Sequence, residues 1–176
     1  TMNWDSFRFI DLFAGIGGIR LGFESTGRYH CVFTSEWDKQ CCKTYSANWP
    51  EEHIFGDIQK IVPSTIPDFD ILCAGFPCQP FSTIGKREGF EHKTQGTLFF
   101  YIVKILKEKK PMAFLLENVP GIISHDKGRT FRTILETLRE DVNYETDYQV
   151  LDAADFGVPQ YRKRVYFVGF RKDLGI

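Results

Sequence analysis

The sequence has few of the features that would place a protein in a membrane or in an oxidising compartment. No apolar run approaches the roughly eighteen residues that a transmembrane helix needs, and no basic stretch followed by an apolar one stands near the N-terminus. The five cysteines are odd in number and include no C-x-x-C pair, and the four histidines are scattered. Neither a disulfide framework nor a bound metal is therefore expected, and we expect an intracellular protein with reduced thiols.

A large excess of charge of one sign is missing too. Lys and Arg number 22 against 23 Asp and Glu, which gives a formal net charge of -1. This balance excludes a disordered acidic tail and a uniformly basic nucleic-acid coat, but it is compatible with a local basic face. What the chain does have is 43% hydrophobic residues over 176 positions, enough for one full-sized core. We expect one domain across residues 1–176.

Short apolar runs of the β type alternate with helical stretches along the chain. Strands are expected at 9–13, 31–35, 54–55, 71–74, 112–116, 148–151 and 164–170, and helices from 19 to before Gly27 and at 39–48, 97–109 and 131–138. This alternation predicts an α/β fold with a doubly wound, mostly parallel sheet. Such sheets bind ligands beyond the carboxyl ends of their strands.

The polar and glycine-rich segments follow these predicted strands, so we expect them to converge in one cleft. They are residues 15–18, Glu36, Asp57, residues 77–79 and the pair Glu117-Asn118. Glu36 stands 18 residues after Gly18, where similar folds place an acid on ribose hydroxyls, and this predicts a nucleoside cofactor. The loop lacks the full G-x-G-x-x-G spacing, because the third residue after Gly18 is Leu21 and not glycine, which disfavours a dinucleotide. Without Glu36 the loop would also suit an ordinary tight turn.

Four segments, in order, resemble the motifs of the DNA (cytosine-5)-methyltransferases. Residues 9–18 are similar to the cofactor motif of that family, residues 75–82 to its nucleophile motif, 117–119 to its acid motif and 160–164 to its Q-x-R-x-R motif. The resemblance covers nearly the whole chain and is closest to bacterial restriction–modification enzymes. It implies a Rossmann-like methyltransferase sheet of strand order 3-2-1-4-5-7-6 with the last strand antiparallel.

The resemblance also implies S-adenosyl-L-methionine as cofactor, S-adenosyl-L-homocysteine as product, duplex DNA as partner, and a place in the bacterial cytoplasm at the nucleoid. The cofactor-binding residues that it implies are Phe13, Ala14, Gly15, Ile16, Gly17, Gly18, Glu36, Trp37, Asp57, Ile58, Phe76, Pro77 and Leu98. The implied substrate-binding residues are Gln79, Ser82, Lys86, Asn118, Val119 and Gln160, and the implied catalytic residues are Cys78, Glu117, Arg162 and Arg164.

Cys78 suits the chemistry of such an enzyme. Cytosine C5 is a poor nucleophile, and addition of a thiolate at C6 turns the ring into an enamine that can attack a sulfonium methyl group. Cys78 follows Pro77 at a junction between strand and loop, whereas Cys31 and Cys73 lie inside apolar runs and are interpreted as core thiols. The alternative for Cys78 is a small buried hydrophobic residue.

Glu117 suits the accompanying proton transfer. Attack at C6 pushes electron density toward N3, where a carboxylic acid with a raised pKa would donate. The alternatives for Glu117 are a solvated acid at the end of a strand and an ion-pair partner of Arg162 or Arg164. The resemblance implies that these two arginines contact the base carbonyl or the DNA backbone and help to hold the thiolate; the alternative is a basic surface cluster with Lys163.

A base inside a duplex lies out of reach of such a cleft, so the resemblance also implies base flipping. Residues 82–93 contain two glycines and several basic residues, a composition typical of a flap that closes on phosphates, or else of a plain surface loop.

Members of the family continue with a target-recognition segment and a final motif that completes the cofactor pocket, and neither is recognised before Ile176. We expect either part of a longer enzyme or one subunit of a split enzyme whose second polypeptide carries the rest. A non-catalytic nucleic-acid-binding module of the same fold and an RNA cytosine-C5 methyltransferase are the alternative functions.

Overall fold

The computed structural model describes residues 6–79 and 97–176, and within them seven strands form one sheet. The strands are β1 (Phe7–Leu12), β2 (Tyr29–Ser35), β3 (Ile54–Phe55), β4 (Ile71–Gly75), β5 (Ala113–Asn118), β6 (Tyr144–Asp152) and β7 (Lys163–Arg171). Their order is β3-β2-β1-β4-β5-β7-β6, with β1 to β5 paired in parallel and β7 antiparallel to both of its neighbours. The predicted α/β class and strand order are confirmed.

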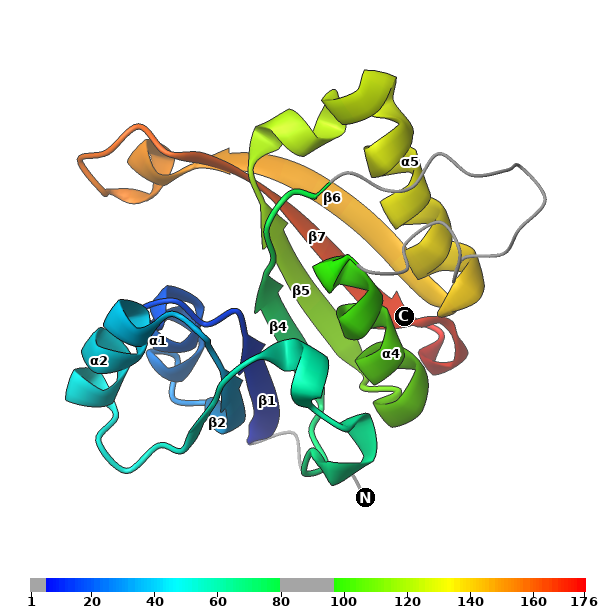
Figure 1. Cartoon of the computed structure of the whole chain (residues 1–176). Coiled ribbons are helices and arrows are strands. Elements are labelled where there is room, and N and C mark those ends of the chain that lie inside the picture. The colour runs from blue at the N-terminus through cyan, green and yellow to red at the C-terminus, as the bar shows by residue number, and fades with distance from the viewer. Residues whose placement is uncertain (1–5, 80–96) are drawn as a thin grey trace.

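Helices cover both faces of this sheet, as Figure 1 shows. On one side lie α1 (Gly18–Glu24) and α2 (Lys39–Asn48), and on the other α4 (Leu98–Lys109) and α5 (Arg129–Glu136). The side chain of Asp38 begins α2 by accepting hydrogen bonds from the N–H groups of Gln40 and Cys41 at 2.9 and 2.8 Å. Thr97 caps α4 in the same manner, so this helix begins one residue later than predicted.

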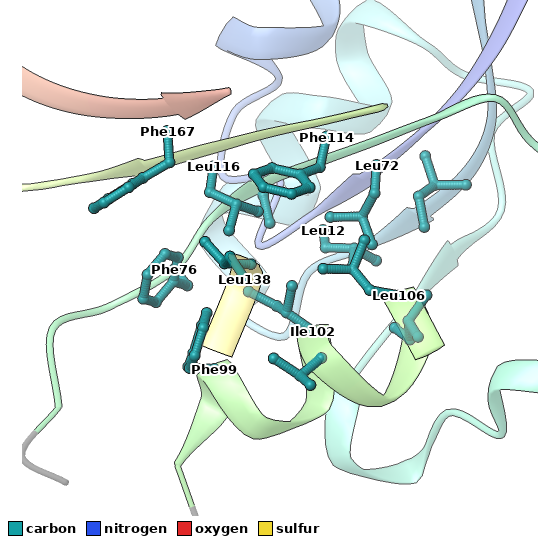
Figure 2. Close-up of a cluster of buried hydrophobic side chains, with 14 of the residues drawn as sticks. Leu12, Leu72, Phe76, Phe99, Ile102, Leu106, Phe114, Leu116, Leu138 and Phe167 are labelled. Atoms are coloured by element: carbon teal, nitrogen blue, oxygen red, sulfur yellow. The ribbon is translucent and has the colours of Figure 1, made fainter. Parts of the chain in front are cut away.

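The largest part of the hydrophobic core lies between the sheet and α4 (Figure 2). Leu12, Leu72 and Leu116 project from three neighbouring parallel strands and are fully buried there. Ile102 and Leu106, one helical turn apart on α4, pack against them. Because this core fixes the central strands relative to one another, it also fixes where their carboxyl ends meet.

The other face of the sheet is packed more with aromatic and polar groups. Phe9 of β1 contacts Phe23 of α1, with ring centroids 5.1 Å apart. Asp11 and Cys73, neighbours in the pairing of β1 with β4, are both completely buried. Cys73 is thus a core thiol as predicted, whereas Cys31 is only partly buried and donates to the backbone oxygen of Phe33 at 3.4 Å. In the two described stretches of chain, no helix is long and apolar enough to span a membrane.

Candidate active site

A cavity of about 530 Å³ opens at the carboxyl ends of the parallel strands. Its walls come from the segments after β1, β2, β3 and β4 and from the first residue of α4. The lining residues are Phe13, Ser35, Glu36, Trp37, Gly56, Asp57, Ile58, Gln59, Gly75, Phe76, Pro77, Gln79 and Leu98. The predicted convergence of these strand ends therefore occurs, and the cavity is large enough for a nucleoside-sized ligand.

Glu36 is the buried acid of this cavity. One carboxylate oxygen accepts from the Gly15 N–H at 2.7 Å, and the other accepts from the Trp37 and Asp38 N–H groups at 2.8 and 2.7 Å. These three backbone donors hold the carboxylate in one orientation. Because two carboxylate oxygens offer about four acceptor positions, about one position is left for a ligand hydroxyl group.

The glycine-rich loop is linked to this cavity through the hydrogen bond from the Gly15 N–H to Glu36. Gly15 and Gly17 have φ angles of +57° and +92°, which favour glycine. Gly17 also has no room for a side chain, because a Cβ atom would lie 2.3 Å from the Trp49 ring. Ile16, Gly17 and Gly18 line a different cavity between α1 and α2, and Ala14, like Gly15, is not part of the lining of the larger one. The structure thus separates the loop residues from the other predicted cofactor residues.

Apolar side chains form the remaining walls. The Trp37 ring is 78% exposed at the rim, an unusual position for so large an aromatic group. Phe13, Ile58 and Leu98 supply further apolar surface. Asp57 accepts from the Gln59 N–H at 2.9 Å and so shapes the turn after β3. An aromatic ring beside a carboxylate is a suitable combination for an adenosine.

Cys78 follows the end of β4 by three residues. Its side chain is partly buried and packs against the hydrophobic core, and this burial raises the pKa of the thiol. Asn118 holds the segment before Cys78 in place: its amide Nδ2 donates to the Phe76 carbonyl at 2.8 Å, and its Oδ1 accepts from the Val119 N–H at 2.8 Å. Cys78 is therefore only partly buried, unlike the completely buried Cys73.

A second cavity, of about 320 Å³, brings together three of the predicted catalytic residues. Glu117 lies on its wall with Arg162 and Arg164, and the Arg164 Nε is 2.8 Å from a Glu117 carboxylate oxygen. The ion pair that the sequence offered as an alternative is therefore present. The other carboxylate oxygen lies 3.2 Å from where a Cβ on Gly75 would stand, so Glu117 also adjoins the end of β4.

The predicted substrate-binding residues are spread over these surfaces. Gln79 lines the larger cavity and accepts from the Leu98 N–H at 2.8 Å, which ties the end of β4 to α4. The Asn118 side chain is buried and bonded to the Phe76 carbonyl, whereas Val119 and Gln160 are exposed. Ser82 and Lys86, together with the proposed flap, lie outside the described residues.

Sequence reasoning missed several lining residues of the two cavities. Ser35 and Gly75 end β2 and β4, and Gly56 and Gln59 follow β3, so position at a strand end was the available signal. Asp152 was missed as well; its carboxylate accepts from the Arg162 N–H at 2.8 Å and holds the loop between β6 and β7. No motif surrounds Asp152, and its role follows only from the pairing of those two strands.

The family model for C-5 cytosine-specific DNA methylase matches residues 7–176. The chain therefore belongs to the C-5 cytosine-specific DNA methylase family. It is 57% identical to the Type II methyltransferase M.BsuFI of Bacillus subtilis, over 96% of this chain and 40% of that protein. It is 58% identical to the Type II methyltransferase M.NgoBI of Neisseria gonorrhoeae, over 96% of this chain and 52% of that protein.

Solved structures show the same fold. A mutant of DNMT2 from Spodoptera frugiperda superposes with a TM-score of 0.77 at 26% identity, over 96% of this chain and 51% of that one. The Dnmt2 methyltransferase of S. pombe superposes with a TM-score of 0.74 at 22% identity, over 94% and 51% of the two chains. The chain thus spans about two fifths to half of the length of the proteins it matches.

Proposed function

We propose that the chain supplies the cofactor site and the catalytic groups of an enzyme that transfers a methyl group from S-adenosyl-L-methionine to C5 of cytosine in duplex DNA. The observation that supports this most strongly is the pairing of Gly75 with Glu117 at neighbouring strand ends, with Cys78 following Gly75 beside the 530 Å³ cavity. Membership of the family and the Type II methyltransferase relatives favour DNA as the acceptor. Such an enzyme would work in the bacterial cytoplasm, at the nucleoid.

The residues of the larger cavity suit the proposed cofactor. Glu36, with about one acceptor position left, binds a ribose hydroxyl, and the rings of Trp37 and Phe13 contact the adenine. The loop around Gly15 positions the Glu36 carboxylate. When bound, S-adenosyl-L-methionine supplies an electrophilic methyl group.

Cys78 is the proposed nucleophile. Its thiol loses a proton to solvent, and the thiolate forms a bond to C6 of the cytosine, which moves an electron pair through the ring and makes C5 nucleophilic. C5 then takes up the methyl group that the cofactor would supply, as the bond between that methyl group and the sulfonium sulfur breaks and leaves S-adenosyl-L-homocysteine. Loss of the C5 proton to water and breakage of the bond between sulfur and C6 restore the aromatic ring and free Cys78. Burial raises the pKa of this thiol and so lowers the share of the reactive thiolate in the free protein.

Glu117 is the proposed hydrogen-bond donor to N3, and Arg164 its positioning partner. The two side chains form an ion pair, so Arg164 holds the Glu117 carboxyl group on the wall of the 320 Å³ cavity. Arg162, on the same cavity wall, is placed to contact the base carbonyl or the DNA backbone. The 320 Å³ cavity between these residues is where we place the flipped cytosine.

Recognition of a DNA sequence is a further requirement. Since this chain spans 40% and 52% of the two Type II relatives, we place sequence recognition in the part of such enzymes that it does not span, carried by the same polypeptide or by a second one.

Covalent trapping tests the proposed function. The protein is incubated with S-adenosyl-L-methionine and DNA duplexes in which 5-fluorocytosine replaces cytosine, because a fluorine at C5 cannot leave as a proton does. We expect an adduct that survives denaturation, detected by intact mass, in the unsubstituted chain and in a Cys41→Ala control, but not in Cys78→Ala. An adduct in Cys78→Ala contradicts the role of Cys78, and absence of both an adduct and cofactor binding in the unsubstituted chain contradicts the function.

A further inference from the structure

A buried polar cluster lies behind the glycine-rich loop, and none of its members lines the 530 Å³ cavity. At its centre is Arg20 of α1, which is only 7% exposed. The guanidinium donates to Glu24 at 2.8 Å, to Glu52 at 2.6 Å and to the Tyr45 hydroxyl at 3.2 Å. Although burial lowers the pKa of Arg20, its hydrogen bonds to Tyr45 and Glu52 outweigh that effect and raise it. A buried cation with this many partners is held in one position.

The cluster contacts Gly17 through the ring of Trp49. The Arg20 Cζ lies 4.7 Å from the centroid of the Trp49 ring, a cation–π contact, and the indole N–H donates to Glu24 at 2.9 Å. Arg20 and Glu24 thus hold the ring from its face and its edge. The ring fills the space that a Cβ on Gly17 would need, so the position of the ring limits how closely the glycine-rich loop can approach α2.

The cluster also reaches the strand that leads into the loop. The Tyr45 hydroxyl donates to a carboxylate oxygen of Asp11 at 3.4 Å and shares a hydrogen bond with Thr34 at 3.1 Å. Asp11 lies in β1, directly before the loop, and is completely buried. Arg20 therefore connects the strand before the loop, the ring beneath it and the helix after it.

On its cavity side the loop makes a single contact with the buried acid, from the Gly15 N–H to Glu36. We propose that Arg20 is a positioning residue for this contact. By fixing Trp49 and Tyr45, Arg20 sets the position of Gly17 relative to α2. The position of Gly17 in turn determines whether the neighbouring Gly15 N–H can form the hydrogen bond that orients the Glu36 carboxylate. Lys cannot replace Arg here, because an ammonium group has no planar face to stack on the ring and no fork of donors to reach three partners. The effect on cofactor affinity rests on the proposed function, whereas the effect on the loop does not.

The experiment compares Arg20→Lys with variants that only destabilise the protein. Ile134→Val and Leu138→Ala lie in the core on the α5 side and serve as controls with a smaller and a larger loss of stability. Binding of S-adenosyl-L-homocysteine is measured by calorimetry, and stability by urea unfolding. We expect Arg20→Lys to weaken binding at least tenfold, while each control stays within twofold of the unsubstituted chain at a temperature where all are folded. Equal affinities for Arg20→Lys and the controls would overturn the proposal.

Amide hydrogen exchange at Gly15 supplies a second measurement, which needs no cofactor. Arg20→Lys should speed exchange of this amide at least tenfold without changing exchange in the middle of β5, and unchanged protection of Gly15 would overturn the proposal. If the unsubstituted chain binds no S-adenosyl-L-homocysteine, the proposed function fails, but the exchange measurement still decides the role of Arg20. Should Arg20→Lys not fold, Glu52→Gln replaces it in both measurements, with an expected fivefold change and the same criterion for rejection.

Conservative replacement of the ring separates positioning from stability. Trp49→Phe keeps an aromatic ring beneath Gly17 but loses the indole donor to Glu24, whereas Trp49→Ala removes the support. We expect Trp49→Phe to keep at least a third of the affinity for S-adenosyl-L-homocysteine and Trp49→Ala to lose more than nine tenths. If the affinities of Trp49→Phe and Trp49→Ala differ only as their urea unfolding midpoints do, the aromatic ring has no separate effect on binding. That result would show that the cluster stabilises the fold without positioning the loop.

Discussion

At the residue scale, backbone groups do much of the positioning in this site. Glu36 is oriented by three N–H groups, one of them from a loop that is 21 residues away in the sequence. A carboxylate held in this way is already in its binding geometry, so little conformational entropy is lost when a ligand hydroxyl binds to it.

The first prediction concerns this carboxylate. Glu36→Ala should weaken binding of S-adenosyl-L-homocysteine by about 1–3 kcal/mol, because a charge-assisted hydrogen bond to the ribose is lost and the Gly15 N–H loses its acceptor. Calorimetric titration of the unsubstituted chain, Glu36→Ala and Glu36→Gln measures the effect. Glu36→Gln keeps one acceptor oxygen and should lie between the other two; unchanged affinity in Glu36→Ala would contradict the assignment of Glu36.

The role of a single residue can be predicted from the sequence when the residues that it contacts stand near it in the chain or follow a known pattern. The sequence predicts that Glu36 lies in the cleft, because Glu36 follows a strand and stands 18 residues after Gly18, and Glu36 does line the 530 Å³ cavity. Arg20 was not recognised, because its partners Tyr45 and Glu52 are 25 and 32 residues away and each has the pattern of an ordinary helix or loop residue. The packing of α1 against α2 brings them together, and a linear pattern does not contain that information.

At the element scale, the ends of β4 and β5 act as one unit. Asn118, the last residue of β5, donates from its side-chain amide to the Phe76 carbonyl just after β4, and its amide oxygen accepts from the Val119 N–H. The side chain therefore holds the segment that leads to Cys78. Its buried position, at 2% exposure, makes loss of either partner costly.

The second prediction tests this link between the two strands. Asn118→Ala should lower the free energy of unfolding by about 1–3 kcal/mol, because the Phe76 carbonyl and the Val119 N–H lose their partners. It should also speed alkylation of Cys78 by iodoacetamide, since the segment is released from the core. Peptide mass mapping of the alkylated cysteines reads this out, and the half-buried Cys41 provides an internal control. Faster alkylation of both thiols to the same extent would point to general loosening instead.

Predicted ranges agree with the structure for some elements, among them the edge strand β3 at 54–55, and differ for others. The predicted helix at 39–48 matches α2, because Asp38 caps its start and Pro50 limits its end. By contrast β6 extends over Tyr144–Asp152, well beyond the predicted 148–151. It is an edge strand of the sheet, and there polar residues such as Glu145 and Asp147 pair with β7 and interrupt the apolar run. The predicted helix at 131–138 likewise begins earlier, at Arg129, and its α-helical part ends at Glu136 before a π-helical turn.

At the scale of the whole molecule, the two faces of the sheet differ in what they bury. The α4 side is an apolar core, whereas the α1 and α2 side contains Asp11 beneath the glycine-rich loop, with one carboxylate oxygen that has no hydrogen-bond partner in the described part of the chain. Burial raises the pKa of Asp11 to about 8. The Tyr45 hydrogen bond and the charge of Arg20 oppose this rise, and the charges of Glu36 and Glu24 add to it.

The third prediction follows from this buried carboxyl and concerns the stability of the whole fold. Folded Asp11 keeps its proton up to about pH 8, whereas in the unfolded chain it ionises near its ordinary pKa of about 3.9. Between these two values the folded protein binds more protons than the unfolded chain. The contribution of Asp11 to the free energy of unfolding is therefore complete below about pH 4 and is lost as the pH rises through 8, by at most about 1.4 kcal/mol per pH unit.

Asp11→Asn isolates this contribution, because the amide keeps an acceptor for the Tyr45 hydroxyl but has no proton to lose. Urea unfolding of both proteins at several values between pH 5 and 8.5 gives the two slopes. The difference in stability between Asp11→Asn and the unsubstituted chain should grow in favour of the variant as the pH rises, since only the unsubstituted chain must take up a proton at this position when it folds. Parallel slopes would contradict the prediction and would mean that Asp11 is ionised in the folded protein. The guanidinium group of Arg20 would then compensate the negative charge of Asp11.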